Sequence, residues 1–447
     1  MAFAVINSVS AVEDSTCSTD TTGPSVVSVD PVNNSVNVPD NKVIKVTFNE
    51  TINVTENSTI QLKNKNTGEQ IPISKSVNDN VLTITPLAKL LAGVQYTLFL
   101  NNITDELGNG MGLYTSTFTT IPMKGYWMHY SDVAGATVAY LQSKGITDVF
   151  VLTRGSDGKT HNAELLAAIS KFTPAGINVH AWIVCFKTGN PSYFVCPSGY
   201  YVKSVYVKTI RYWGWKKKAY KVKKKVRWKK VRGKWKYKYK IVIRYKWRKG
   251  WIYKPIYKTV SGYDYTYRNN LLNYIQSISN YANLAGIHLD YVRYSGVASK
   301  GHAAYQEPGG ATAAVNAVTG FVQQVNSKIR PGVLLSAAVM PECGNNPGYY
   351  GQDYSRLADY LDFFVPMTYE GNYNTGNSWI TSVTNYIVSR AKGKPVYDGF
   401  TTYVSDSNTW TADSDLAADV QSAKAGGAKG FVLFRYGTSG YTNVPAW

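Results

Sequence analysis

The sequence predicts a multidomain protein that joins an N-terminal all-β sandwich to an α/β TIM (β/α)8 barrel with an inserted basic β-hairpin. Three patterns support this prediction. Short alternating runs separated by turn residues fill the first quarter of the chain. Eight apolar runs then alternate with amphipathic helical stretches, and a segment crowded with Lys and Arg interrupts them. With 447 residues and a hydrophobic fraction of 44%, the chain is long enough for several cores.

The expected domain boundaries follow these changes of pattern. Residues 1–23 are predicted to be a signal remnant or a disordered tail, because Met1–Asp14 has an apolar middle without a positively charged start. Residues 24–121 are assigned to the sandwich and 123–447 to the barrel, within which 187–262 form the insertion. No run of 18 apolar residues occurs, so no membrane span is expected.

The sandwich is predicted from alternating runs such as Val43–Phe48 and Tyr96–Leu100. The segment GPSVVSVDPVNNSVNVPDNKVIKVTFNETI, with the later ITDELGNGM and STFTT, resembles bacterial Ig-like domains of surface proteins and secreted hydrolases. The resemblance implies a spacer or adhesive domain without catalytic residues. This quarter of the chain also holds Asn-x-Ser/Thr sequences, which favour an exported protein, at Asn33, Asn49, Asn53, Asn57 and Asn102.

The barrel is predicted from strands that alternate with helices, since eight such units close into a cylinder whose working face is the carboxyl end of its strands. The expected strands are 125–130, 148–154, 178–186, 286–294, 334–341, 361–369, 395–403 and 429–437. The clearest helices are 162–172, 269–285, 313–329 and 415–427. The basic insertion follows the third strand, at the working face.

The fourth predicted strand, GIHLDYVRY, carries Asp290 within an apolar run. A buried carboxylate needs a partner. Arg293 on the same strand, or Arg154 and Arg435 at the ends of the second and eighth strands, are the candidate partners. The alternative interpretation is a structural Asp–Arg ion pair in the barrel mouth.

The sixth predicted strand ends in Met-Thr-Tyr-Glu and supplies a second acid, Glu370. Glycosidic cleavage requires two carboxyl groups, so Asp290 and Glu370 are the expected catalytic pair. Tyr369 and Glu370 are consecutive and point inward together only if Glu370 lies past the strand end. The rivals for the second role are Glu342 and Asp398, with Asp132 weaker.

Further polar and aromatic side chains at the predicted strand ends are expected to bind substrate. His180 and His288 lie inside strands and are expected to be structural. Neither His and acidic residues at metal-ligand spacing nor a Gly-rich phosphate loop occurs, so no metal or cofactor is expected. Cys185 and Cys196 either close a short disulfide loop or remain free thiols. The predicted substrate-binding residues are His129, Arg154, Trp182, Arg293, Tyr294, Glu342, Tyr369, Asp398 and Arg435.

Two of these strands carry a family resemblance. GIHLDYVRYS and LDFFVPMTYEGNY resemble glycoside hydrolase barrels whose fourth strand reads D-Y-[VI]-R-[FY]-P and whose sixth reads V-P-M-x-Y. The likeness spans 123–447 apart from the insertion. It implies Asp290 as the key carboxylate, with Arg293 and Tyr369 in the pocket. Ser295 stands where the family has Pro.

The sixth strand is also similar to the M-x-Y-D of family 18 chitinases, with Glu370 at the acidic position. Their fourth-strand motif D-x-x-D-x-D-x-E falls on Ala285, His288, Asp290 and Val292, so three acids, including the proton donor, are missing. A chitinase mechanism is therefore disfavoured. A nucleophile on the fourth strand with an acid/base on the sixth resembles the α-galactosidase-type barrels, which makes Asp290 the nucleophile and Glu370 the acid/base.

The insertion concentrates the positive charge of the chain. Residues 200–260 hold 24 of the 48 Lys and Arg and no Asp or Glu. Apolar and cationic residues alternate on both sides of a turn at 232–234, which predicts a hairpin with one aromatic–aliphatic face, one cationic face and arms of about 40 Å. The cations expected to bind polymer are Lys221, Lys223, Lys225, Arg227, Lys236, Lys238, Lys240 and Arg244.

Such a density of charge indicates an anionic partner. Aromatic residues interleaved with cations are also typical of nucleic-acid binding. The neighbouring domains favour an acidic wall or surface polysaccharide, peptidoglycan-like or pseudomurein-like, so no nucleic acid is expected. The alternative is a lid whose aromatic face packs on the barrel. The sequence therefore predicts a secreted or cell-surface glycoside hydrolase, and the competing hypothesis is a non-catalytic polysaccharide-binding protein or adhesin.

Overall fold

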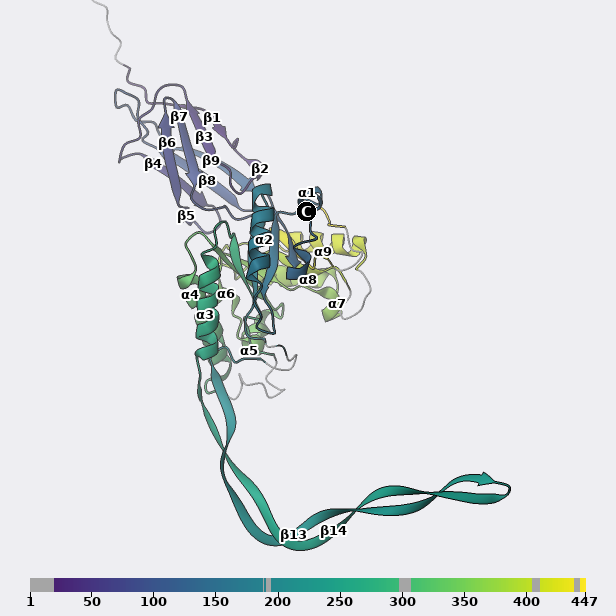
Figure 1. Cartoon of the computed structure of the whole chain (residues 1–447). Coiled ribbons are helices and arrows are strands. Elements are labelled where there is room, and N and C mark those ends of the chain that lie inside the picture. The colour runs from purple at the N-terminus through teal and green to yellow at the C-terminus, as the bar shows by residue number, and fades with distance from the viewer. Residues whose placement is uncertain (1–19, 188, 190–193, 297–306, 404–410, 438–442) are drawn as a thin grey trace, which may run out of the picture. The chain divides into compact units, whose positions relative to one another are not determined.

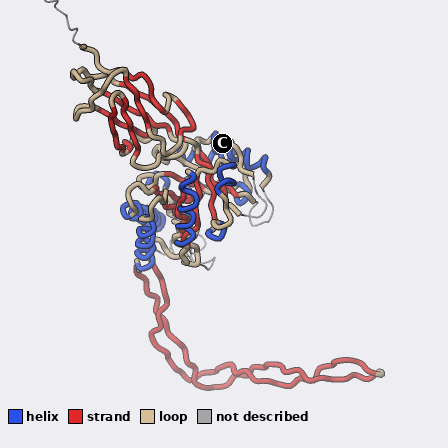
Figure 2. Tube along the Cα trace, turned by 45° about the horizontal axis from the view of Figure 1, so that its top comes forward, coloured by secondary structure: helices blue, strands red, loops and turns tan. Residues whose placement is uncertain are grey.

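The computed structural model of the chain is shown as a cartoon in Figure 1 and as a Cα tube in Figure 2. It describes residues 20–447 except 188, 190–193, 297–306, 404–410 and 438–442. The first 19 residues of the expected N-terminal tail, Cys17 among them, lie outside the described residues. The described chain divides into two compact units, the segment Gly199–Asp264 and the remainder. No helix of the described residues is long and apolar enough to cross a membrane.

Two β-sheets form the N-terminal sandwich, with strand orders β1-β3-β7-β6 and β2-β9-β8-β4-β5. Alternation along each strand builds the core. In β8, for example, Tyr96, Leu98 and Leu100 are buried and their neighbours are half-exposed. The strands are β1 Val26–Asp30, β2 Ser35–Val38, β3 Ile44–Phe48, β4 Thr59–Asn64, β5 Gln70–Ile71, β6 Ile73–Asn78, β7 Val81–Pro86, β8 Gln95–Asn101 and β9 Tyr114–Thr120.

The barrel is a parallel sheet of eight strands in the order β17-β16-β15-β12-β11-β10-β19-β18. Parallel bridges between Phe364 and Val396 and between Met367 and Gly399 join its two edges. The interior strands are buried on both faces, as parallel strands covered by helices must be. The strands are β10 Met123–Met128, β11 Asp148–Arg154, β12 Asn178–Val184, β15 Gly286–Asp290, β16 Leu334–Val339, β17 Phe363–Pro366, β18 Asp398–Thr401 and β19 Gly430–Phe434.

Helices surround this sheet, as the blue segments of Figure 2 show. Each packs an apolar stripe inward. In α4 the stripe includes Val318, Phe321, Val322 and Val325, at helical spacing. The predicted helix at 162–172 is confirmed to the residue. The α-helices are α1 Val138–Ser143, α2 Asn162–Phe172, α3 Thr266–Ser279, α4 Gly310–Lys328, α5 Asn346–Tyr350, α6 Tyr354–Leu357, α7 Glu370–Tyr373, α8 Asn377–Val388 and α9 Asp413–Ala425.

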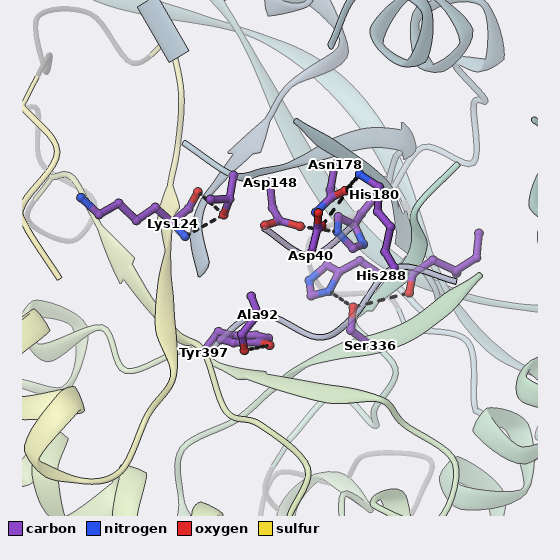
Figure 3. Close-up of polar contacts among 12 residues, drawn as sticks. Asp40, Ala92, Lys124, Asp148, Asn178, His180, His288, Ser336 and Tyr397 are labelled. Atoms are coloured by element: carbon purple, nitrogen blue, oxygen red, sulfur yellow. Dashed lines mark hydrogen bonds and ion pairs between the residues drawn. The ribbon is translucent and has the colours of Figure 1, made fainter. Parts of the chain in front are cut away.

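The two buried histidines belong to the barrel interior, as predicted (Figure 3). His180 Nε2 lies 2.9 Å from Asp148 Oδ1, and His288 Nδ1 lies 2.9 Å from Ser336 Oγ. Burial lowers the pKa of His288 well below its ordinary value, so this ring is neutral. A side chain at Gly286 would collide with His180 Nδ1 and the Leu334 carbonyl, so a glycine is required there. These histidines hold the barrel strands together and do not reach its mouth.

The second unit is the inserted hairpin, formed by β13 Tyr200–Val231 and β14 Lys234–Tyr263. Arg232 and Gly233 both have positive φ, 47° and 77°, which is the two-residue turn that suits strand twist. At about 3.3 Å per residue each arm is on the order of 100 Å long. The expected arms of about 40 Å were too short, because pairing continues from the turn to Tyr200 and Tyr263.

The prediction of one aromatic face and one cationic face is wrong. The register shifts between Arg227 and Lys229, so Trp228 is an extra residue in β13. This bulge moves the pairing by one residue, and a one-residue shift transfers the side chains of β13 that precede Trp228 to the other face. Several cations of β13 then lie opposite apolar side chains of β14. These pairs are Lys221 with Ile243, Lys223 with Ile241, Lys225 with Tyr239 and Arg227 with Tyr237.

The bulge removes some of the like-charge pairs of the ladder, although Lys224 still faces Lys240 and Lys218 still faces Lys246. Without the bulge, Lys221 would face Arg244, Lys225 would face Lys240, and Arg227 would face Lys238. Like charges directly opposite each other destabilise a ladder, whereas a cation over an aromatic ring is attracted to it. The observed cation–π contacts on this ribbon include Lys225 over Tyr237 at 4.4 Å and Lys217 over Tyr245 at 4.5 Å. The ribbon therefore presents rings and charges on the same face.

Candidate active site

Asp290 ends β15, at the carboxyl end of the fourth barrel strand. Asp290 is 8% exposed to solvent. Trp182 Nε1 donates to Oδ2 at 3.0 Å, and the Tyr291 backbone N–H donates to Oδ1 at 2.7 Å. Burial raises the pKa of Asp290, while these two hydrogen bonds and the charges of Arg293 and Lys187 oppose the rise. The carboxyl group is thus oriented at the expected working face.

Of the three arginines considered as partners of Asp290, none forms an ion pair with it among the described residues. Arg154 donates to the Val184 carbonyl and to Tyr267. Arg435 lies 3.7 Å from Asp132. Arg293 donates to the Tyr294 carbonyl at 3.0 Å. The structural Asp–Arg ion pair is therefore not formed in the described part of the chain.

Glu342 follows β16 at the same end of the barrel. Tyr350 and Tyr373 donate their hydroxyls to Oε1 at 3.0 and 2.8 Å. The second oxygen, Oε2, is buried and has no hydrogen-bond partner in the described structure. The Arg293 guanidinium lies 5.1 Å from the Tyr350 ring centre and also contacts the Tyr291 ring. Arg293 therefore lies between the surroundings of Asp290 and those of Glu342.

Glu370, the predicted second acid, has different partners. It begins α7, and its carboxyl group hydrogen bonds to Asp419 of α9. Burial and the Glu370 carboxylate raise the pKa of Asp419 to about 8, and burial and Asp415 raise that of Glu370. Glu370, Asp415 and Asp419 line a cavity of about 170 Å³, together with Tyr369, Phe400 and Tyr403. Glu370 thus interacts with α9.

Tyr369 and Glu370 both lie past the end of β17, where α7 begins. Tyr369 is half-buried and lines the same cavity as Glu370. Burial and the Asp290 carboxylate raise the pKa of Tyr369 well above its ordinary value. Because both residues lie beyond the strand, strand alternation does not set the direction of Glu370, whose carboxyl group is hydrogen bonded to Asp419.

The other predicted substrate-binding residues lie in different surroundings. Trp182 and Arg293 accompany Asp290. His129 pairs with Ser131, at 2.7 Å, and burial and Arg435 lower its pKa. Tyr294 is buried and donates its hydroxyl to Glu307 at 3.0 Å.

The predicted placement of Asp398 at the working face is wrong. It is the first residue of β18, at the opposite end from the working face, and is completely buried. Thr384 of α8 donates to its Oδ2 at 2.6 Å. The side chain therefore lies between the barrel and α8 and does not bind substrate. Burial raises its pKa to about 7.

This buried acid predicts a pH-dependent stability. Between the unfolded pKa, about 4, and the folded pKa near 7, only the unfolded state releases the proton, so the free energy of unfolding falls as pH rises. Asp398→Asn keeps the acceptor for Thr384 and removes this loss. The variant is expected to match the wild type in melting temperature at pH 4 and to exceed it at pH 8, by on the order of 3 kcal/mol in stability. Calorimetry at both pH values tests this, and an equal difference at both contradicts it.

Sequence reasoning missed Lys187 and Asp419. Lys187 follows β12, and its position at a strand end was the available signal. Asp419 lies inside α9, where nothing in the sequence distinguishes it from a surface acid.

Cys185 and Cys196 are free and buried. Among the described residues, Asp20, Glu50 and Asp105 of the sandwich form the group of acids whose oxygens lie within 4.8 Å of one another.

The chain combines a parallel barrel with carboxylates at its carboxyl rim, and two carboxyl groups are what glycosidic cleavage requires. Residues 216–392 match the family described as "Putative glycosyl hydrolase domain", and residues 20–120 match "Bacterial Ig-like domain". The chain therefore carries a segment similar to bacterial Ig-like domains, followed by a segment similar to a glycosyl hydrolase domain. No curated protein matches the chain.

Solved structures resemble the fold. The PgaB (BpsB) glycoside hydrolase domain from Bordetella bronchiseptica is 10% identical, with a TM-score of 0.46, over 71% of this chain and 95% of that one. A class V chitinase from Pseudomonas fluorescens is 14% identical, with a TM-score of 0.43, over 72% and 97%. The Bacillus cereus spore cortex-lytic enzyme SleL is 12% identical, with a TM-score of 0.41, over 71% of each.

Proposed function

We propose that this glycoside hydrolase cleaves an acidic cell-wall or surface polysaccharide outside the cell, with Asp290 as an essential carboxylate. The observation that carries the proposal is the placement of Asp290, which is buried at the carboxyl end of the fourth strand and held through both oxygens. The Ig-like domain and the Asn-x-Ser/Thr sequences of the sandwich support export.

The raised pKa of Asp290 supports the role of proton donor. A carboxyl group that keeps its proton toward neutral pH can deliver it to the leaving sugar oxygen. The Trp182 indole fixes the direction of the group. This assignment differs from the nucleophile that the α-galactosidase resemblance implies, because burial favours the protonated form.

Glu342 is the better candidate for the second carboxylate. The two phenol hydroxyls occupy Oε1, so Oε2 is the oxygen available to attack the sugar or to accept a proton from water. Arg293 lies near both acids. The Glu370 carboxyl group, by contrast, is hydrogen bonded to that of Asp419. In the proposed reaction Asp290 protonates the glycosidic oxygen while Glu342 acts on the opposite side of the sugar ring.

Release of reducing ends from purified wall glycans tests the function. The wild type is expected to release them from acidic glycans in proportion to enzyme and time. Binding of these glycans without any release would contradict hydrolysis and support the competing role of a polysaccharide-binding protein or adhesin.

The ribbon is proposed to hold the acidic polymer. Replacing three of its lysines, Lys221, Lys223 and Lys225, by Gln is expected to weaken polymer binding by about tenfold, because exposed charges act through screened attraction. Raising the salt from about 0.05 to 0.5 M should weaken the wild type similarly. Sedimentation with insoluble wall glycan measures both effects.

The matched control removes the same number of exposed charges from the sandwich strands, through Lys→Gln at Lys45, Lys65 and Lys75. This control should bind as the wild type does. Equal losses in the two variants, or binding that is independent of salt, would refute a specific electrostatic role of the ribbon.

A further inference from the structure

Two cations lie at the rim beside Asp290. Lys187 follows β12, and Arg293 comes three residues after Asp290. Both contact one ring, that of Tyr291. Lys187 Nζ lies 4.4 Å from the ring centre and donates to its hydroxyl at 3.0 Å, and the Arg293 guanidinium lies 4.8 Å from the same centre. Neighbouring strand ends thus bring two positive charges to one side chain.

The aromatic surroundings orient Arg293. Its guanidinium also lies 5.5 Å from the Phe194 ring and 5.1 Å from the Tyr350 ring. Rings on several sides restrict the long side chain and prepare its planar donors for an incoming group. Tyr291 itself has a positive φ of 49°, an uncommon conformation for a residue with a bulky side chain. Such strain is typical of functional sites.

Neither cation has an acidic partner in the described structure. No carboxylate oxygen of the described residues lies within 4 Å of the charged nitrogens of Lys187 or Arg293. Arg293 Nε is buried and makes no hydrogen bond. Both Asp290 oxygens accept hydrogen bonds from other groups. A half-buried guanidinium without an anion is costly, so the rim is prepared to receive one.

We propose that Lys187 and Arg293 form a subsite for the carboxylate of an acidic sugar at the cleaved bond. The inference rests on the proposed function and deepens it, because it places selection for acidic sugars in the active site as well as on the ribbon. Arg binds carboxylates through two parallel N–H···O bonds, and Lys adds a point charge. The planar carboxylate matches the donor geometry of the guanidinium.

The test compares an acidic wall glycan with the same glycan after chemical reduction of its carboxyl groups to alcohols. The double variant Lys187→Met, Arg293→Met should lose about 10- to 100-fold in kcat/KM on the acidic glycan, mainly through KM. On the reduced glycan its loss should be at least about tenfold smaller, with each enzyme compared at its own pH optimum, because removing the two charges also raises the pKa of Asp290. Lys187→Met alone, at the more adaptable side chain, should show a smaller loss in the same direction. The control Lys45→Met, Lys75→Met removes the same charge from the sandwich and should change neither rate.

Equal losses on both glycans would overturn the inference, as would an unchanged preference for the acidic one. If the wild type cleaves neither glycan, the proposed function fails. In that case the binding of an acidic monosaccharide tests the subsite independently of cleavage. Saturation-transfer NMR with D-glucuronate and D-glucose is the probe. Glucuronate binding that is at least about tenfold weaker in the double variant than in the control supports the subsite. Equal glucuronate binding in both variants overturns it.

Discussion

Asp290→Asn is expected to lower kcat for glycan hydrolysis by about 100- to 10,000-fold, because the amide cannot donate the proton that the leaving oxygen needs. The substitution keeps the size of the side chain and an acceptor for Trp182 or for the Tyr291 N–H. The fold should therefore survive, which thermal unfolding checks. Reducing-end release from the acidic glycan measures the loss.

The leaving group distinguishes a proton donor from a nucleophile. An aryl glycoside of the sugar that the wild type releases needs little protonation, so Asp290→Asn should recover most of its rate on that substrate. Equal loss on both substrates would instead make Asp290 the nucleophile. Unchanged turnover of the glycan would remove Asp290 from the mechanism altogether.

The second large effect concerns the partner of Asp290. Glu342→Gln is expected to reduce kcat by about a thousandfold on the glycan and the aryl glycoside alike, because a nucleophile or base is needed whatever the leaving group. The Gln side chain retains an oxygen for the hydroxyls of Tyr350 and Tyr373, so the loss reports chemistry.

The matched variant is Glu370→Gln, which changes the acid predicted from the sequence in the same way. It should keep kcat within about fivefold, because Glu370 is hydrogen bonded to Asp419 and faces α9. The opposite ranking of the two variants would reinstate Glu370 as the acid/base and exclude Glu342. Comparable large losses in both would indicate that the two sites are coupled.

The sequence identified most of the molecule because its periodicities are local. Apolar runs of strand length, separated by helical patterns, predicted the barrel, and the helix at 162–172 is confirmed to the residue. Most of the barrel strands end earlier than expected, whereas β11 ends at Arg154 as predicted. For example, 286–294 becomes Gly286–Asp290, because the apolar pattern continues into the rim after the ladder has ended.

The candidate site was only partly predictable. A carboxylate inside an apolar strand is conspicuous, and Asp290 lies where the strand pattern placed it. The surroundings of Glu342, Glu370 and Lys187 were not accessible, because they depend on loops whose partners are distant in the chain. Tyr373 and Glu342, for instance, are 31 positions apart and meet through a hydrogen bond of 2.8 Å.

By itself the sequence determined the two domains, the β-ribbon and the acid at the end of the fourth strand, because each follows from hydrophobic period and charge along a short segment. The tertiary structure decided the surroundings of Glu342 and Glu370, the direction of Asp398, and the register of the ribbon. The acids depend on loops that bring distant residues together, and Asp398 depends on where its strand begins. The register of the ribbon depends on a single residue, since side chains alternate with period two and one shift reverses the face to which they point.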